Sequence, residues 1–311
     1  MNAIETTGLT RKFGERTAVE GLTLSIPHGT VFGFLGPNGA GKTTTVRMLA
    51  ALIAPTSGTA TVNGHQIGVE NEAVRRSVGI LTETPGLYGK LTAMQNLVFF
   101  AGLYEVDEAT AKKQAERYLK LMELWERRDD KVAGFSKGMR QKVAIARALI
   151  HEPPVVFLDE PTAGLDPEAA RTVRDFIREL HVEGRTIFLT THNLTEADEL
   201  CDLIAVFRTR QMRVDTPANL RRALFGTGTL VQFTTDPAQW VTVAKALPFV
   251  HDASAHDGTL AIRMDDPDKQ NPLLVQALVE AGAPIRYVEP MTHSLEDVYL
   301  ELIAEDEAKN G

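Results

Sequence analysis

The sequence lacks the features that mark secreted and membrane-spanning proteins. It has a single cysteine, Cys201, among 311 residues, which excludes an internal disulfide and indicates a reducing compartment. The first ten residues contain no basic region followed by an apolar block, so we expect no signal peptide. No run approaches the roughly 18 apolar residues of a membrane span, and the best candidate, residues 48–54, fits a core helix. We therefore expect a cytoplasmic protein.

An excess of positive charge is also missing. The formal net charge is −8, which disfavours non-specific binding to nucleic acid because such binding needs a basic surface. We find no internal repeat and no low-complexity segment. With 43% hydrophobic and 24% charged residues, the composition is that of an ordinary globular protein, and the length suffices for two domains.

Residues 36–43 form the motif around which the rest of the sequence is organised. They read Gly-Pro-Asn-Gly-Ala-Gly-Lys-Thr, between the apolar run 31–35 and a helical stretch. In this G-x-x-x-x-G-K-[ST] pattern, glycines let the backbone close around an anion, and N–H groups at the helix start point toward it. Lys42 adds a positive charge for the terminal phosphates, and Thr43 offers a hydroxyl to Mg²⁺. The motif predicts that the chain binds a nucleoside triphosphate.

Strands and helices alternate around this phosphate loop, which predicts an α/β domain with a mostly parallel sheet. The stretch 92–151 has helical signals without strands, so we expect a separate helical lobe there. Glycines at 226 and 228 mark a boundary between a nucleotide-binding domain at 1–225 and an accessory domain at 226–311. The accessory domain alternates strands and helices in an order typical of a small α+β domain of split βαβ type.

Two carboxylates follow the apolar run 155–158. Because ligands sit at the carboxyl ends of parallel strands, we expect Asp159 and Glu160 to lie beside the phosphate loop. Asp159 can hold Mg²⁺, directly or through water. Glu160 can polarise the water that attacks the γ-phosphate. The two motifs together predict hydrolysis of the bound nucleotide.

A third motif lies just before this strand. The stretch 135–142 reads FSKGMRQK, and here the chain resembles the ATP-binding subunit of ATP-binding cassette (ABC) transporters. The family signature, of Leu-Ser-Gly-Gly-Gln type, is matched at Ser136 and Gly138. The sequence PTAGLD at 161–166 matches the D-loop of the family, and His192 stands where the family places its switch histidine. The resemblance covers residues 1–225.

The resemblance implies a P-loop NTPase cassette of the ABC type with a helical subdomain, and it adds roles for four residues. Phe13 stacks on adenine, and His192 contacts the γ-phosphate and helps to orient the water. Ser136 and Gly138, at a helix N-terminus that attracts phosphate, meet the ATP that a second cassette binds. The nucleotide-binding residues are then Phe13, Gly36, Pro37, Asn38, Gly39, Ala40, Gly41, Lys42, Thr43, Thr44, Ser136 and Gly138.

Three positions depart from the family pattern: Lys137 and Met139 replace the second glycine and the glutamine of the signature, and Glu83 is the third. Where the family usually has a glutamine that reaches Mg²⁺ and touches the membrane partner, this chain has Glu83. A carboxylate can ligate Mg²⁺, but its charge would also crowd Asp159, Glu160 and the phosphates. Glu83 is thus either a third metal ligand beside Thr43 and Asp159 or a contact residue.

The resemblance also implies the function. It indicates a subunit that hydrolyses ATP, dimerises with a second copy of itself, and drives separate permease subunits from the inner face of the cell membrane. Similarity at 85–88, 136–141 and 294–299 to the drug or ABC-2 branch favours export. The cargo would be selected by the membrane subunits and not by this chain.

Two other classes of protein fit the sequence less well than a transporter subunit does. A soluble ABC ATPase of translation would carry two cassettes in one chain, and one of DNA maintenance would interrupt the cassette with a long coiled coil. This chain has one cassette and no such insertion. A P-loop kinase or GTPase would leave the signature and His192 unexplained. We therefore predict a transport ATPase with ATP and Mg²⁺ as ligands and no nucleic-acid partner.

Overall fold

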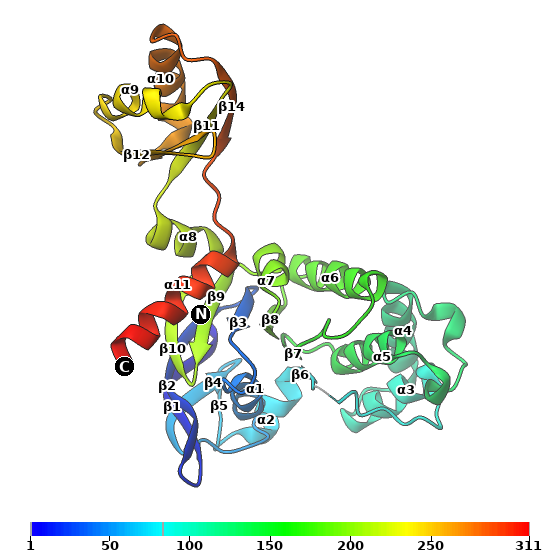
Figure 1. The fold of residues 1–311 in the computed structure, drawn as a ribbon. Coiled ribbons are helices and arrows are strands. Elements are labelled where there is room, and N and C mark those ends of the chain that lie inside the picture. The colour runs from blue at the N-terminus through cyan, green and yellow to red at the C-terminus, as the bar shows by residue number, and fades with distance from the viewer. Residues whose placement is uncertain (1, 83, 311) are drawn as a thin grey trace. The chain divides into compact units, whose positions relative to one another are not determined.

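The computed structural model of the protein describes residues 2–82 and 84–310. The chain divides into two compact units, unit 1 at Met1–Pro217 and unit 2 at Ala218–Gly311. Each unit has its own sheet and its own hydrophobic core. Figure 1 shows the elements of both units. The functional domain boundary after residue 225 stays a prediction.

A ten-stranded sheet forms the centre of unit 1 in the part of the chain that the structure describes. Its strand order is β5-β4-β1-β2-β10-β9-β3-β8-β7-β6. Parallel pairing joins β6 (Val78–Leu81), β7 (Val155–Asp159), β8 (Thr186–Thr191), β3 (Val31–Leu35) and β9 (Leu203–Arg208). The other strands are β1 (Asn2–Phe13), β2 (Arg16–Pro27), β4 (Ser57–Val62), β5 (His65–Gln66) and β10 (Arg210–Asp215).

The sheet confirms the predicted α/β fold, and five of the nine strand pairs among the described residues are parallel, including β2 with β10. The pairs β1·β2, β1·β4, β4·β5 and β9·β10 are antiparallel. Three of these antiparallel pairs are joined by short turns, and a short turn can connect only antiparallel neighbours.

Continuous burial of β3, β7 and β8 explains why these segments form the centre of the sheet. All residues of the three strands are buried, as expected for parallel strands covered on both faces. The Phe188 ring lies 5.3 Å from the rings of Phe32 and Phe34 and 5.6 Å from that of Phe157, measured between centroids. This packed aromatic centre fixes the carboxyl ends of the three strands relative to one another. The helices of this part of the unit are α1 (Lys42–Leu49), α2 (Asn71–Ser77), α6 (Pro167–Val182) and α7 (Leu194–Leu200).

Three helices form a lobe beside the sheet (Figure 1). They are α3 (Ala93–Leu103), α4 (Glu108–Leu121) and α5 (Lys137–Leu149), with 3₁₀ turns at Trp125–Arg127 and Val132–Gly134. A capping box starts α3, because Thr92 accepts from the Gln95 N–H at 3.1 Å while the Gln95 side chain accepts from the Thr92 N–H. Asp107 is the N-cap of α4 and accepts from the Thr110 N–H at 3.0 Å. Among the described residues of 92–151, strand pairing is limited to one isolated bridge.

Unit 2 contains a four-stranded antiparallel sheet in the order β12-β13-β11-β14. Its elements are α8 (Pro217–Phe225), β11 (Gly228–Phe233), a 3₁₀ turn (Pro237–Trp240), α9 (Val241–Lys245), β12 (Val250–His256), β13 (Thr259–Met264), α10 (Pro267–Glu280), β14 (Ile285–Pro290) and α11 (Leu295–Asn310). Each of β11 and β13 lies between the two strands of a βαβ connection, so the predicted split βαβ type is confirmed.

Helix α10 begins at Pro267, because Asp266 caps it by accepting from the Lys269 N–H and Pro267 occupies the first turn. Proline is favoured at that position because its missing N–H has no partner there in any case.

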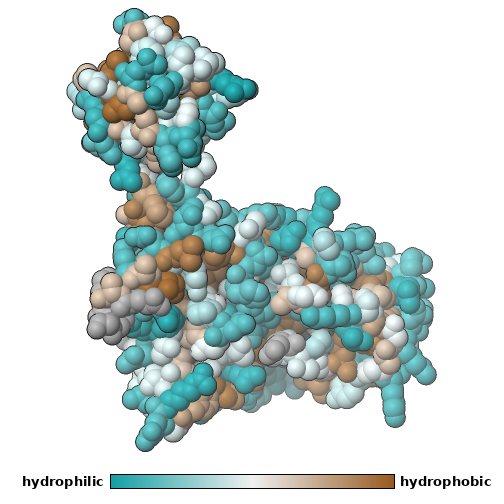
Figure 2. All heavy atoms as spheres, in the orientation of Figure 1, coloured by the Kyte–Doolittle hydropathy of each residue, from teal (hydrophilic) through white to brown (hydrophobic). Residues whose placement is uncertain are grey.

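None of the helices in the described residues combines the length and the apolar character that crossing a lipid bilayer requires. In Figure 2, hydrophilic side chains are spread over the visible face of unit 1, and hydrophobic ones lie between them in separate patches.

Candidate nucleotide-binding and catalytic site

The phosphate loop runs from the end of β3 into α1, and its shape depends on two glycines. A Cβ atom at Gly36 would lie 2.2 Å from the carbonyl oxygen of Phe207. Gly41 has a φ of 109°, and a Cβ there would lie 2.2 Å from the carbonyl oxygen of Ala18. Any side chain at either position would displace a neighbouring strand. The loop can therefore approach a ligand closely with its backbone, as the motif predicts.

Lys42 is buried, and its ammonium group bridges the loop and the acid pair. Its Nζ donates to the carbonyl oxygens of Gly36 at 2.8 Å and Pro37 at 3.3 Å. The same atom lies 3.3 Å from Glu160 Oε1. The first residue of α1 thus reaches the residue that follows β7, which brings the two predicted motifs together.

Asp159 ends β7 with one carboxylate oxygen paired and one free. Oδ1 accepts a hydrogen bond from the Thr190 hydroxyl at 2.5 Å, whereas the buried Oδ2 has no hydrogen-bond partner among the described residues. A buried carboxylate oxygen is costly to leave unpaired. Together with the half-buried hydroxyl-bearing Thr43 of α1, Oδ2 offers the oxygen donors that Mg²⁺ prefers. Glu83 lies outside the described residues.

Glu160 is held in a strained conformation between Lys42 and His192. Its φ of 52° lies in the left-handed region, and its N–H donates to the Thr190 carbonyl oxygen at 3.0 Å. Its Oε2 accepts from His192 Nδ1 at 2.6 Å. Strain of this kind persists where surrounding contacts determine it, and it is frequent at catalytic sites. Glu160 and His192, 32 residues apart in the sequence, are in direct contact.

Ser136 and Gly138 lie at the start of α5 in the helical lobe. Ser136 caps the helix by accepting from the Met139 N–H at 3.2 Å. A Cβ at Gly138 would lie 3.0 Å from Ala169 Cβ, so a larger residue would press against α6. Lys137 donates to the Ala163 carbonyl oxygen at 3.0 Å and Gln141 to that of Pro161 at 3.0 Å. The signature helix is therefore tied to the loop that follows Glu160.

The remaining predicted residues belong to the phosphate loop, to the first turn of α1 and to the end of β1. Phe13 is 48% exposed, and the Arg11 guanidinium lies 4.5 Å from its ring centroid. Pro37 is half-buried, Asn38 and Gly39 are exposed, Ala40 is buried and Thr44 is half-buried.

Two residues of this site, Thr190 and Glu196, were not predicted from the sequence. The Thr190 hydroxyl donates to Asp159 Oδ1 and accepts from the Glu160 N–H. The signal that could have identified Thr190 was its position near the C-terminal end of a buried strand that pairs with β7. Glu196 on α7 is 2% exposed and lies beside the hydroxyls of Thr162 and Thr191. Burial raises the pKa of the Glu196 carboxyl above its ordinary value. An acidic residue in a short helix gave no sign of this burial.

Comparison with known proteins identifies the family. The family described as "ABC transporter" matches residues 19–163. The chain is 32% identical to the Linearmycin resistance ATP-binding protein of Bacillus subtilis (strain 168), over 96% of each chain. It is 37% identical to the Daunorubicin/doxorubicin resistance ATP-binding protein of Streptomyces peucetius, over 96% of this chain and 92% of that one. Identity to the Nod factor export ATP-binding protein I of Rhizobium sp. (strain N33) is 32%, over 99% of each.

Solved structures agree with this assignment. An ATP-binding subunit of an ABC transporter is similar with a TM-score of 0.67 and 32% identity, over 72% of this chain and 94% of that one. A dimeric ATP-binding cassette in a post-hydrolysis state with ADP and Pi is similar with a TM-score of 0.63 and 26% identity, over 68% of this chain and 98% of that one. The relatives give no support to a role in translation or DNA maintenance. The chain belongs to the ABC transporter family, as an ATP-binding subunit that hydrolyses ATP.

Proposed function

We propose that two copies of this chain close around two ATP molecules and drive export through separate permease subunits at the inner face of the cell membrane. The observation that carries the proposal is the series of contacts from Lys42 through Glu160 to His192 at the carboxyl ends of β7 and β8. These contacts place a cation, a base and a second polar group around one point beside the phosphate loop. Relatives matched over their full length include proteins named for drug resistance and for Nod factor export, which supports export.

In this proposal each residue of the series has one role in hydrolysis. Lys42 binds the terminal phosphates, and Glu160 takes a proton from the attacking water. His192, which contacts the Glu160 oxygen that Lys42 does not contact, donates to the γ-phosphate. The backbone of the phosphate loop cradles the nucleotide through Gly36, Pro37, Asn38, Gly39, Ala40, Gly41 and Thr44. Thr43 and Asp159 Oδ2 would hold Mg²⁺, which neutralises charge on the phosphate oxygens when bound.

Each nucleotide site would be completed by the second copy. Ser136 and Gly138 present free N–H groups at the start of α5, where the helix dipole favours an anion. Their own hydrogen bonds and contacts go to the lobe and to α6 and the loop after Glu160. We therefore assign them to the γ-phosphate bound by the partner copy. In the post-hydrolysis cassette that resembles this chain, the protein is likewise a dimer.

Phe13 is proposed to stack on the adenine ring, and its removal should weaken ATP binding. Half of the ring is exposed, and Arg11 covers it only in part. Because stacking on an aromatic side chain contributes about 1–3 kcal/mol per base, Phe13→Ala should raise the Kd for ATP by about tenfold or more. Phe13→Tyr, which keeps the ring, should leave the Kd nearly unchanged. A fluorescent ATP analogue in equilibrium titration measures both, and an unchanged Kd for Phe13→Ala would remove Phe13 from the site.

An exposed aromatic cluster marks the surface that we assign to the permease. Tyr88 is 51% and Phe99 44% exposed, and both rings contact Phe100. Arg147 donates to the carbonyl oxygens of Pro85 and Gly86 and lies 4.9 Å from the Phe100 ring centroid. Tyr88 lies in the loop after β6, the loop that touches the membrane partner in the family, and Phe99 and Phe100 lie on α3. An apolar, aromatic surface of this kind suits a hydrophobic segment of the permease.

Purification from native membranes tests the proposed partner. Affinity capture of the tagged chain in mild detergent should recover a polytopic membrane protein, because the proposal places the permease in a separate chain that this subunit binds. A variant with Tyr88→Ser and Phe99→Ser should bind ATP normally and lose that protein. Recovery of ribosomes or DNA alone would contradict a transport function and favour the soluble class of ABC ATPases.

A further inference from the structure

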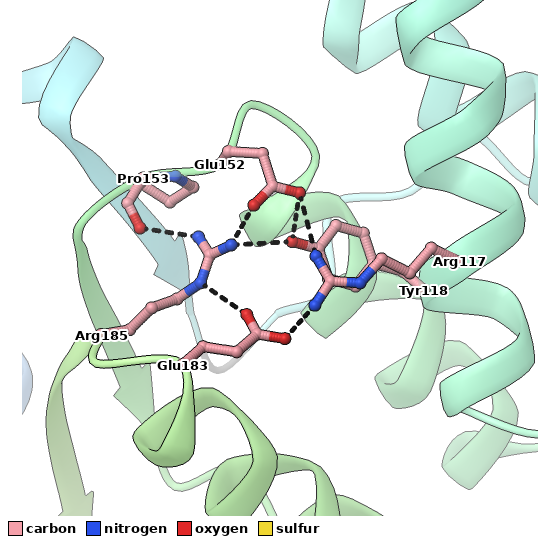
Figure 3. Close-up of polar contacts among 6 residues, drawn as sticks. All are labelled: Arg117, Tyr118, Glu152, Pro153, Glu183 and Arg185. Atoms are coloured by element: carbon pink, nitrogen blue, oxygen red, sulfur yellow. Dashed lines mark hydrogen bonds and ion pairs between the residues drawn. The ribbon is translucent and has the colours of Figure 1, made fainter.

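A partly buried network of charged side chains lies where the helical lobe meets the sheet (Figure 3). We call it the junction cluster and define it as Arg117, Tyr118, Glu152, Glu183 and Arg185. Its residues come from three places: α4 of the lobe, the segment between α5 and β7, and the segment between α6 and β8. The cluster joins elements that are between 33 and 67 residues apart in the sequence. The hydrolytic site described above does not use it.

Arg185 is the centre of the cluster. Its side chain is 10% exposed, and all three guanidinium nitrogens have partners. Nη1 donates to the Pro153 carbonyl oxygen at 2.9 Å and Nε to Glu183 Oε2 at 3.3 Å. Nη2 donates to the Tyr118 hydroxyl at 3.3 Å and pairs with Glu152. A buried arginine with this many partners fixes the relative position of all of them, since each bond has a defined direction.

Tyr118 and Arg117 connect this centre to α4. The buried Tyr118 hydroxyl donates to Glu152 Oε1 at 2.7 Å while it accepts from Arg185. Burial raises the pKa of Tyr118, so the hydroxyl stays a donor at neutral pH. Arg117 lies 3.5 Å from Glu152 Oε1 and also pairs with Glu183. Two arginines thus balance two glutamates, and both glutamates are shared between α4 and Arg185.

The position of the cluster links it to the signature and to both catalytic strands. Glu152 follows the C-terminal end of α5, whose other end carries Ser136. Arg185 directly precedes β8, which leads to His192, and Pro153 leads into β7, which ends beside Glu160. Helix α5 has 13 residues, so a tilt of about 5° at its base would move Ser136 by about 2 Å. A displacement of that size is enough to disrupt contacts with a phosphate.

We propose that the junction cluster sets the angle at which the helical lobe presents Ser136 to the nucleotide of the partner copy. Arg117 and Arg185 are then positioning residues for the ATP-bound dimer. They touch neither the nucleotide nor the reacting atoms. The inference rests on the proposed function, because it requires Ser136 to act on the other copy.

Arg117→Met is the first test of this role. The Arg117 side chain is 39% exposed, so its replacement removes the ion pairs of α4 with Glu152 and Glu183 without emptying the core, and leaves only the Tyr118 hydroxyl to join α4 to the cluster. We expect the dissociation constant of the ATP-bound dimer to rise by about tenfold, because the lobe no longer has a single resting angle. ATP binding to the monomer should not change, since Lys42 and its loop are untouched. Arg117→Lys should restore part of the loss.

The dimer is best measured in a Glu160→Gln background, where hydrolysis cannot remove the nucleotide. Analytical ultracentrifugation with ATP gives the dimer constant, and a fluorescent ATP analogue at low protein concentration gives binding to the monomer. Arg178→Met is the matched control: it removes the same charge from exposed ion pairs with Asp175 and Glu199. That control should dimerise as the parent does.

The angle of the lobe can be observed directly with two spin labels. The labels are attached through Lys113→Cys on α4 and Glu20→Cys on β2, both exposed. Cys201 is buried, and burial raises the pKa of its thiol, so it should stay unlabelled. Arg117→Met should broaden the distribution of distances between the labels, whereas Arg178→Met should not. A merely structural role would lower thermal stability and leave this distribution as narrow as in the parent.

The outcomes separate this inference from the proposed function. If Glu160→Gln dimerises on ATP and Arg117→Met dimerises equally well, the junction cluster has no positioning role. The same conclusion follows if Arg178→Met weakens the dimer as much as Arg117→Met does. If Glu160→Gln binds ATP and stays monomeric, the composite site proposed for Ser136 is wrong, and the inference falls with it.

Discussion

Glu160→Gln is expected to lower the rate of ATP hydrolysis by about 100-fold to 10,000-fold, the usual contribution of a general base, while ATP still binds. The amide has the same size as the carboxylate and can keep a contact with His192. It cannot accept a proton from water at neutral pH. Binding should persist because the loop geometry depends on Gly36 and Gly41, and Lys42 keeps its bonds to two loop carbonyls.

Two measurements distinguish a lost base from a damaged site. Phosphate release under saturating ATP gives the rate, and equilibrium titration with a fluorescent ATP analogue gives the Kd. Glu168→Gln removes an exposed carboxylate from the first turn of α6 and serves as the control; its rate should equal that of the wild type. Near-normal turnover by Glu160→Gln would show that Glu160 does not activate the water.

Local chemistry was sufficient to predict most elements of unit 1. The apolar runs at 31–35 and 155–158 are continuous, which is typical of a strand covered on both faces, and both strands are buried. A cap residue gave one helix start: Ser136, predicted to lie at a helix N-terminus, accepts a backbone N–H at the first turn of α5. These features depend on neighbours within a few residues, which the sequence displays directly.

Pairings between distant segments could not be predicted in the same way. The contact of Lys42 with Glu160 was expected only as proximity, because it follows from the order of strands in the sheet. The bond from Thr190 to Asp159 depends on the register of β7 with β8. The junction cluster is harder still, since Arg117, Glu152 and Arg185 are ordinary surface residue types whose contacts are decided by how the lobe packs. Thr190 and Glu196 were missed in the site for the same reason, because their contacts depend on how distant segments pack.

A mixture of two inactive variants is expected to regain activity if Ser136 acts on the partner copy. Lys42→Met should lose phosphate binding, and Ser136→Glu should place a negative charge against the γ-phosphate. Each alone should hydrolyse ATP at least about 100-fold more slowly than the wild type, the effect of losing one phosphate-stabilising group. In a mixed dimer, one site combines the intact Lys42 of one copy with the intact Ser136 of the other. An equal mixture should reach roughly a quarter of the wild-type rate if copies pair at random, since half of the dimers are mixed and each has one intact site.

The matched control replaces Ser136→Glu with Glu160→Gln in the same mixture. Lys42 and Glu160 lie 3.3 Å apart in one chain and therefore belong to one site. Each site of a mixed dimer would then lack either Lys42 or Glu160, so this mixture should stay inactive. Recovery with Ser136→Glu and none with Glu160→Gln would assign Ser136 to the partner's nucleotide, because only then do both defects of a mixed dimer fall in one site and leave the other site intact. Recovery in neither mixture would contradict that assignment, and full activity of Ser136→Glu alone would remove Ser136 from the site.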